Sequence, residues 1–136
     1  MIRLNKSIQS AVTRDANAGR SFLPSAANGI CSRLGDKWTV QVIWQLSLSD
    51  GHRLRFSALK KAIDGIAQRM LTLTLRNLER DGFVERHYFP EVPPRVEYEL
   101  TEMGIGILQA LEGVNFWITD NLAGVEANRR AYDAER

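Results

Sequence analysis

The sequence predicts a mainly α-helical fold with a small β-hairpin. Apolar residues recur at helical spacing in "KWTVQVIWQLSL" and again in "IAQRMLTLTLRNLERDG". The period then changes to two, because Val96, Tyr98 and Leu100 alternate with charged residues. A further apolar helix is expected from Glu102 to about Leu122. These observations indicate one small helical domain that carries a hairpin.

The first long helix is expected after Asp36, a residue type that caps helix N-termini well. Pro24 separates the N-terminal segment from this region, and a short helix is expected over residues 26–33. In the long helix, apolar residues at helical intervals predict a buried stripe of Val40, Ile43, Trp44 and Leu48.

Two shorter helices and a tight turn follow. Ser57 is expected to cap "ALKKAI", and Asp64–Gly65 is expected to end that helix. The next helix is expected over residues 67–81 and to stop at Gly82, with a buried seam of Leu71, Leu75 and Leu78. Two helices joined by a glycine-containing turn and followed by a hairpin are the parts of a winged helix-turn-helix.

The hairpin has a stiffened tip. "FVERHYF" and "RVEYEL" flank Pro90, Pro93 and Pro94, and proline cannot donate to a strand ladder. The prolines limit the conformations of the hairpin tip before it binds, so less conformational entropy is lost on binding. This suits a wing that lies along the phosphate backbone of DNA. The prolines could alternatively serve only to prevent edge-to-edge aggregation.

The outward face of residues 67–81 predicts a DNA-reading surface. Gln68, Thr72 and Arg76 form an i, i+4, i+8 row, and Arg69 and Leu73 lie beside it. Arginine pairs with guanine, glutamine with adenine, and threonine offers a hydroxyl and a methyl group. Supporting contacts to the phosphate backbone of DNA are expected from Lys60, Lys61, Arg86, His87 and Arg95, and also from Arg53 and Arg55. The alternative is a solvated helix face that carries a few arginines.

Composition excludes several classes of protein. The 136 residues carry a net charge of +2, with an excess of basic residues over 33–95 and of acidic residues over 96–136. No apolar run is long enough to span a membrane, and one cysteine with two histidines makes neither a disulfide framework nor a zinc cluster. Cys31, His52 and His87 lie in three different elements without any catalytic motif, so we expect no enzyme activity, cofactor or metal.

The last helix has more apolar surface than one seam requires. We expect it to pair with its mate in a homodimer through Ile107, Leu111, Val114, Trp117 and Ile118. The alternative is an intramolecular cap over the core. The expected organisation is an N-terminal basic arm or short helix over 1–24, a winged helix-turn-helix over 25–101, and a dimerisation helix with a charged tail over 102–136.

Residues 25–115 resemble the HxlR-type winged-helix transcriptional regulators. The resemblance rests on "LGDKWTVQVIWQL" and on the run from "RFSALKKAIDG" through "RNLERDGFVERHYFPEVPPRVEYELTEMG". It implies a homodimeric DNA-binding regulator of the prokaryotic cytoplasm. It also implies a two-fold dimer that binds a pseudo-palindromic operator on double-stranded DNA.

Two positions depart from the family pattern. Many relatives carry a sensing cysteine about 13 positions before the tryptophan of the first motif, where this chain has Ser25. Cys31 lies later, on the short helix, where packing as a small hydrophobe is expected. Relatives often have serine at the start of the recognition helix, where this chain has Ala67.

We therefore expect a sequence-specific transcriptional regulator, by default a repressor because no activation domain is visible. The alternative is a winged-helix module that senses a small-molecule effector or binds a protein partner at the dimer interface. Trp38, Trp44 and Trp117 could line such a site, although aromatic residues at helical spacing more often belong to a core.

Overall fold

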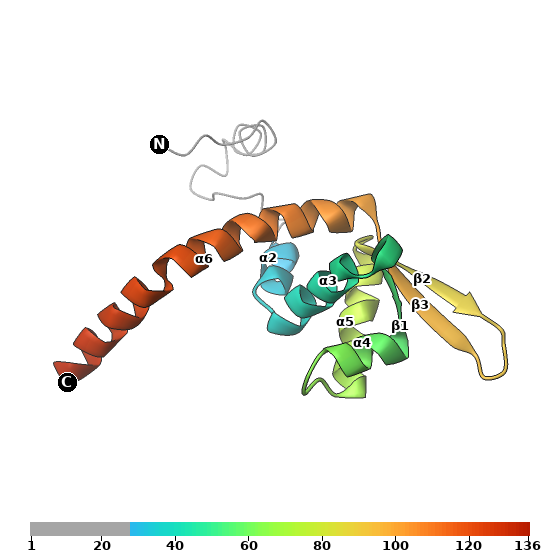
Figure 1. Cartoon of the computed structure of the whole chain (residues 1–136), viewed down its shortest axis with the longest axis horizontal. Helices are drawn as coiled ribbons and strands as arrows, with labels where there is room; N and C mark the ends of the chain where they lie inside the picture. The colour runs from blue at the N-terminus through green and yellow to red at the C-terminus, as the bar shows by residue number, and fades with distance from the viewer. Residues whose placement is uncertain (1–27) are drawn as a thin grey trace. The chain divides into compact units, whose positions relative to one another are not determined.

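The computed structural model describes residues 28–136, and the chain divides into two parts between Val40 and Gln41. The elements run in the order helix, helix, short strand, two helices, hairpin and long helix (Figure 1). Their bounds are α2 Asn28–Leu34, α3 Lys37–Leu48, η2 Asp50–His52, β1 Arg53–Arg55, α4 Phe56–Ala62, α5 Gln68–Arg80, β2 Val84–Phe89, β3 Arg95–Leu100 and α6 Glu102–Ala134. The mainly helical fold with a small hairpin is as predicted, and β1 extends the hairpin to three strands. The expected arm over 1–24 lies outside the described residues.

In the part that ends at Val40, α2 stops before Gly35 and Asp36 caps α3. The Asp36 carboxylate accepts hydrogen bonds from the backbone N–H of Trp38 at 3.2 Å and from the Thr39 hydroxyl at 3.0 Å. The predicted N-cap is therefore confirmed. Cys31 is exposed, so the expectation that its thiol packs as a small hydrophobe is wrong.

The core of residues 41–136 is built by α3, α4, α5 and the sheet. Its buried apolar side chains are Val42, Ile43, Leu46, Leu59, Ile63, Ile66, Leu71, Leu75, Leu78, Phe83, Val84, Tyr98 and Leu100. The stripe predicted for α3 is right at Ile43, which is buried, and wrong at Trp44 and Leu48, which are 48% and 63% exposed. Val42 and Leu46 are buried as well, at i and i+4 on the side that the core covers.

The turn between α4 and α5 is anchored at both ends. Ile63 and Ile66 are buried, and the backbone N–H of Ile66 donates to the carbonyl of Ile63 at 3.4 Å. Gly65 has a φ of 80°, which glycine adopts without the penalty of a side chain. Ser57 does not cap α4 as predicted, because the helix begins at Phe56 and its N-cap position is Arg55.

The helix α5 keeps the predicted seam and nearly the predicted length. Leu71, Leu75 and Leu78 are completely buried, while the N-cap position is Ala67. The helix ends at Arg80, and Gly82 then takes a φ of 81°. The buried seam fixes which face of α5 is turned to solvent.

The sheet has the antiparallel order β1-β3-β2, with β3 in the centre. Tyr98 and Leu100 are buried on one face of β3, so Glu97 and Glu99 lie on the other. Glu99 is paired with Glu85 on β2 and with Arg53 on β1. The face away from the core therefore brings together charged residues from all three strands.

The helix α6 begins at a side-chain cap. Thr101 accepts a hydrogen bond from the backbone N–H of Gly104 at 3.1 Å, and its hydroxyl donates to the carbonyl of Gly82 at 2.6 Å. The helix continues to Ala134, well beyond the predicted end near Leu122, so residues 123–134 of the expected charged tail are helical. Over the described part of the chain, no helix combines the length and apolarity that crossing a bilayer demands.

Candidate nucleic-acid interface

The outward face of α5 gathers the residues predicted to read DNA. Gln68, Arg69, Thr72 and Arg76 line one hollow of about 640 Å³, together with Leu73. This face is turned outward because the leucines of the seam occupy the opposite side of the helix. The structure therefore places all four predicted α5 residues on one accessible surface.

The cations on this surface are free to accept an anionic partner. Arg69 and Arg76 are exposed, and within residues 28–136 neither forms an ion pair with a carboxylate. The Thr72 hydroxyl donates to the backbone carbonyl of Gln68 at 2.9 Å, so its oxygen retains capacity as an acceptor. The surface combines two guanidinium groups, an amide and a hydroxyl.

A second hollow, of about 340 Å³, connects α5 with the hairpin. It is lined by Thr72, Arg76, Glu79, Arg86 and Tyr98. Arg86 comes from β2, and its guanidinium carbon lies 5.7 Å from the centroid of the Tyr88 ring. Arg86 therefore shares a surface with α5, as expected for a wing residue that acts beside a recognition helix.

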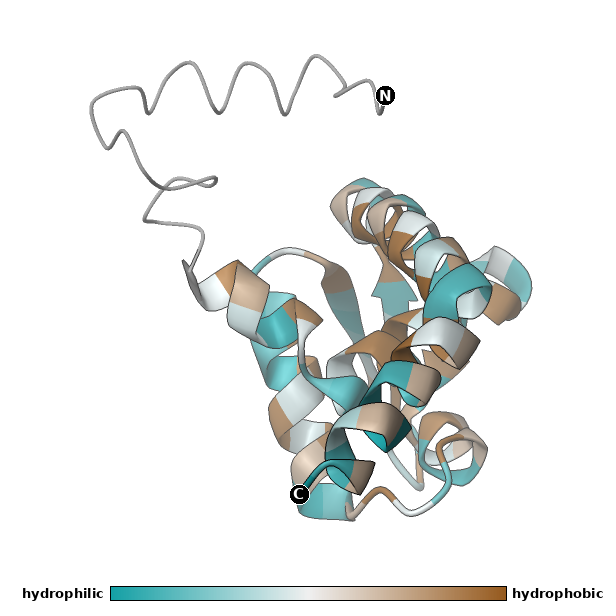
Figure 2. Ribbon diagram, turned by 90° about the vertical axis from the view of Figure 1, so that its left-hand side faces the viewer, coloured by the Kyte–Doolittle hydropathy of each residue, from teal (hydrophilic) through white to brown (hydrophobic). Residues whose placement is uncertain are grey.

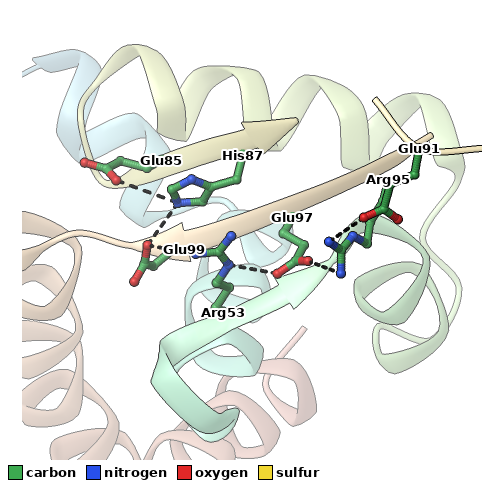
Figure 3. Close-up of polar contacts among 7 residues, drawn as sticks. All are labelled: Arg53, Glu85, His87, Glu91, Arg95, Glu97 and Glu99. Carbon is green, nitrogen blue, oxygen red and sulfur yellow. Dashed lines mark hydrogen bonds and ion pairs between the residues drawn. The ribbon is translucent and has the colours of Figure 1, made fainter. Parts of the chain in front are cut away.

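His87 and Arg95 lie on the other face of the sheet, in a ladder of hydrogen bonds and ion pairs (Figure 3). His87 Nε2 lies 2.9 Å from Glu99 Oε1 and 3.7 Å from Glu85 Oε2. Arg95 contacts Glu91 at 2.9 Å and Glu97 at 3.0 Å, and its guanidinium stacks on Phe89. His87 and Arg95, both predicted to contact the DNA backbone, thus already have carboxylate partners.

Glu97 is the centre of this ladder. The Arg53 Nε donates to its carboxylate at 2.8 Å, and Arg95 approaches it from the other side. The hydrogen bond from Arg53, supported by the charges of Arg53, Arg95 and Arg55, holds the pKa of Glu97 below its ordinary value of 4.5. The ladder joins β1 to β3 electrostatically.

The remaining predicted cations lie on α4 and β1. Lys60 and Lys61 occupy the last turn of α4, and neither lines the two hollows described above. Arg55 is exposed, whereas Arg53 is engaged by Glu97 and Glu99. All four positions precede α5 in the chain, and none of them lines either hollow.

The structure also reveals neighbours that were not predicted. Glu79 and Tyr98 line the second hollow, but the sequence pattern marked Tyr98 only as a core-facing strand residue. Glu79 lies seven residues after Thr72, a helical interval that places both on the same side of α5. That interval is the signal that could have identified Glu79.

One cluster has the donor atoms of a metal site. The side chains of Glu85, His87 and Glu99 place one potential ligand atom each within 4.8 Å of one another. The expectation of no metal site was based on the number of cysteines and histidines alone. Such a count cannot reveal a cluster made of two glutamates and one histidine. His87 Nε2 and Glu99 Oε1 are also within hydrogen-bond distance of each other, at 2.9 Å.

The predicted dimer residues follow one side of α6. Ile107 and Leu111 are half-buried, whereas Val114, Trp117 and Ile118 are 55%, 59% and 45% exposed. Leu122 is also 46% exposed, and hydrophobic and hydrophilic residues alternate along the helix that leads to the mark C (Figure 2). Large apolar side chains on α6 are therefore left uncovered by the described chain.

Comparison with known proteins agrees with this geometry. Residues 33–126 match the model of the HxlR-like helix-turn-helix family. An HTH-type transcriptional regulator of Methanothermobacter thermautotrophicus is 46% identical over 86 residues, which are 63% of this chain and 63% of that relative. The HTH-type transcriptional regulator YdeP of Bacillus subtilis is 40% identical over 103 residues, or 74% of this chain and 78% of YdeP.

A solved structure shows the same fold. The reduced form of the transcriptional regulator YodB from B. subtilis superposes with a TM-score of 0.61 at 32% identity, covering 71% of this chain and 91% of YodB. The winged arrangement of α4, α5 and the hairpin, the family match and these relatives lead to one conclusion. The chain belongs to the HxlR-like helix-turn-helix family and is a transcriptional regulator with a winged helix-turn-helix DNA-binding fold.

Proposed function

We propose that the protein is a repressor that binds a pseudo-palindromic operator as a homodimer, with α5 of each subunit in the major groove. The observation that carries this proposal is the outward surface of α5, where Gln68, Arg69, Thr72 and Arg76 surround one hollow. Two arginines that have no carboxylate partner among residues 28–136, on an exposed helix face, suit guanine edges and phosphates. The N-terminal half of the helix is the part that contacts bases in this class of motif.

The hairpin supplies the contacts that position α5. Arg86 adjoins Arg76 in the second hollow and is the hairpin residue best placed to meet the same DNA segment. His87 and Arg95 remain proposed phosphate contacts, but each would have to exchange a carboxylate partner for a phosphate. Lys60 and Lys61 are proposed to neutralise phosphates, which contributes affinity without sequence information.

The uncovered side of α6 supports the proposed homodimer. Val114, Ile118 and Leu122 follow one another at helical intervals, and all three are exposed in the single chain. Burial of this stripe against a second copy would remove apolar surface from water at roughly 25 cal/mol per Å². Two α5 helices about 34 Å apart would then read two half-sites on the same side of the duplex.

The experiment begins with selection of bound duplexes from a random pool, followed by titration of the selected sequence. Arg69→Ala and Arg76→Ala should each weaken binding to the selected duplex by about 5- to 150-fold, equivalent to ~1–3 kcal/mol per bidentate contact. Binding to a scrambled duplex should weaken much less. Lys60→Ala should weaken both duplexes alike and reduce the salt dependence by about 0.9 in slope.

Arg130→Ala is the matched control, because Arg130 is exposed on α6 and its loss removes the same charge. Wild-type affinity in this variant shows that the effects at Arg69 and Arg76 depend on position. Equal losses for all three arginine variants would contradict reading by α5. A selection that enriches no sequence would contradict the proposed function as a whole.

Repression and an effector need a separate readout. A reporter placed behind the selected sequence should be less active when the protein is present, and activity should return with Arg69→Ala. Increased reporter activity would contradict repression. A small molecule or protein that changes reporter output only when Trp117 is intact would instead support sensing at the dimer interface.

A further inference from the structure

Packing within the fold does not explain why a leucine occupies the exposed position 73. Its side chain is 48% exposed, whereas Leu71, Leu75 and Leu78 of the same helix are completely buried. The core therefore does not require an apolar residue at position 73. Leu73 is therefore an apolar side chain on an exposed helix face that is otherwise polar around it.

Its neighbours identify the chemistry of that contact. Leu73 lines the same hollow as Arg69 and Arg76, which are one helical turn before and after it. A purely apolar partner would leave these two guanidinium groups desolvated, which is unfavourable. The suitable partner is polyanionic and presents an apolar group between its hydrogen-bonding atoms. In the major groove that group is the C5-methyl of thymine.

We infer that Leu73 contacts a thymine methyl group and sets the preference for thymine at one position of each half-site. This inference rests on the proposed function, in which α5 lies in the major groove. Leucine cannot accept a hydrogen bond, so the N4 donor of cytosine would meet an apolar surface and lose its water. Arg69 and Arg76 provide the hydrogen bonds to neighbouring groups, and Leu73 adds discrimination that they do not provide.

The test uses uracil, which differs from thymine only by lacking the methyl group. Each thymine of the selected duplex is replaced singly by deoxyuridine, and affinities are measured for the wild-type protein and Leu73→Ala. For the wild type, replacement of one particular thymine in each half-site should weaken binding about fourfold, equivalent to ~0.8 kcal/mol for one buried carbon. Leu73→Ala should bind the thymine and uracil duplexes equally at that position.

Met70→Ala is the matched control, because Met70 is also exposed on α5, at 38%, but does not line the hollow. It should keep the wild-type discrimination between thymine and uracil. Leu73→Met should largely restore the discrimination, since methionine is apolar and of similar volume. Unchanged melting temperatures should accompany Leu73→Ala, because the side chain is outside the core.

The outcomes separate this inference from the proposed function. A selected duplex that depends on Arg69 but shows no uracil effect would overturn the inference alone. The same holds for a uracil effect that persists in Leu73→Ala. A protein that selects no duplex would overturn the proposed function and this inference together.

Discussion

Ala67 occupies the N-cap position of α5 without the acceptor that this position favours. Its backbone is extended, with φ −74° and ψ 147°, and it forms no side-chain cap. Ala67→Ser should stabilise the fold by about 1 kcal/mol, because the hydroxyl can accept a hydrogen bond from a first-turn N–H. Thermal unfolding followed by circular dichroism measures the change. Ala67→Val adds no acceptor and should not stabilise, and a serine variant that melts with the wild type would contradict the assignment.

Gly104 and Gly106 have opposite roles within one turn of α6. A Cβ at Gly104 would overlap the carbonyl oxygen of Phe83 and crowd Leu100, whereas a Cβ at Gly106 would meet nothing within 4 Å. Gly104→Ala should therefore destabilise the fold by roughly 1–3 kcal/mol. Gly106→Ala should stabilise it by roughly 0.5–1 kcal/mol, since alanine is the better helix former. Denaturant unfolding of both variants tests the pair, and a Gly104→Ala variant as stable as the wild type would show that the close approach at Gly104 is absent.

At the scale of elements, the sheet depends on the ionised form of Glu97. Arg53 stabilises this carboxylate, so its pKa is lower in the folded chain than the ordinary 4.5 of the unfolded chain. The stabilisation is present above pH 4.5 and is lost as the pH falls through the lowered pKa. The melting temperature of Glu97→Gln should therefore be below that of the wild type at neutral pH and converge with it in acid.

The control for this titration is Glu126→Gln, which removes an exposed carboxylate of α6 that is outside the ladder. It should follow the wild type across the whole pH range. A difference between Glu97→Gln and the wild type that stays constant from neutral to acid pH would show that the charge of Glu97 contributes nothing.

The sequence predicts the buried face of α5 well and the buried face of α3 only in part, for one physical reason. In α5 the apolar residues at helical spacing are mostly leucines, so few alternative buried faces fit the pattern. All three leucines of the predicted seam are buried. In α3, apolar residues occupy almost every side of the helix, and any of several stripes fits the pattern. The choice of Val42 and Leu46 over Trp44 and Leu48 is made by tertiary packing, which local periodicity does not encode.

The hairpin shows the same limit for the site. Composition marks Arg86, His87 and Arg95 alike as cations near a stiff tip. The register assigns Arg86 to the face that adjoins α5, and His87 and Arg95 to the ladder on the other face. Strand alternation predicts that Arg86 and His87 diverge, but only the pairing with β3 shows which of them meets α5.

At the scale of the whole molecule, the oligomeric state depends on what covers the exposed apolar side of α6. Ile118→Glu should convert the proposed dimer into a monomer at micromolar concentration, because it would bury an unpaired charge in the interface. Light scattering measures the mass, and circular dichroism should show that the helical content is kept. Ala127→Glu is the matched control, since Ala127 is exposed and lies on the opposite side of the helix from Ile118. A wild-type mass equal to 15.4 kDa would contradict the dimer directly.

The outward face of α5 should lie in the major groove of each half-site. Methylation of guanine N7 places a methyl group in the major groove at the atom where arginine binds. Interference by this methylation should appear in two clusters about one helical turn, or ~34 Å, apart, and Arg69→Ala or Arg76→Ala should abolish the interference at individual guanines. Full binding to duplexes methylated at every guanine N7 would contradict the placement of α5 in the groove.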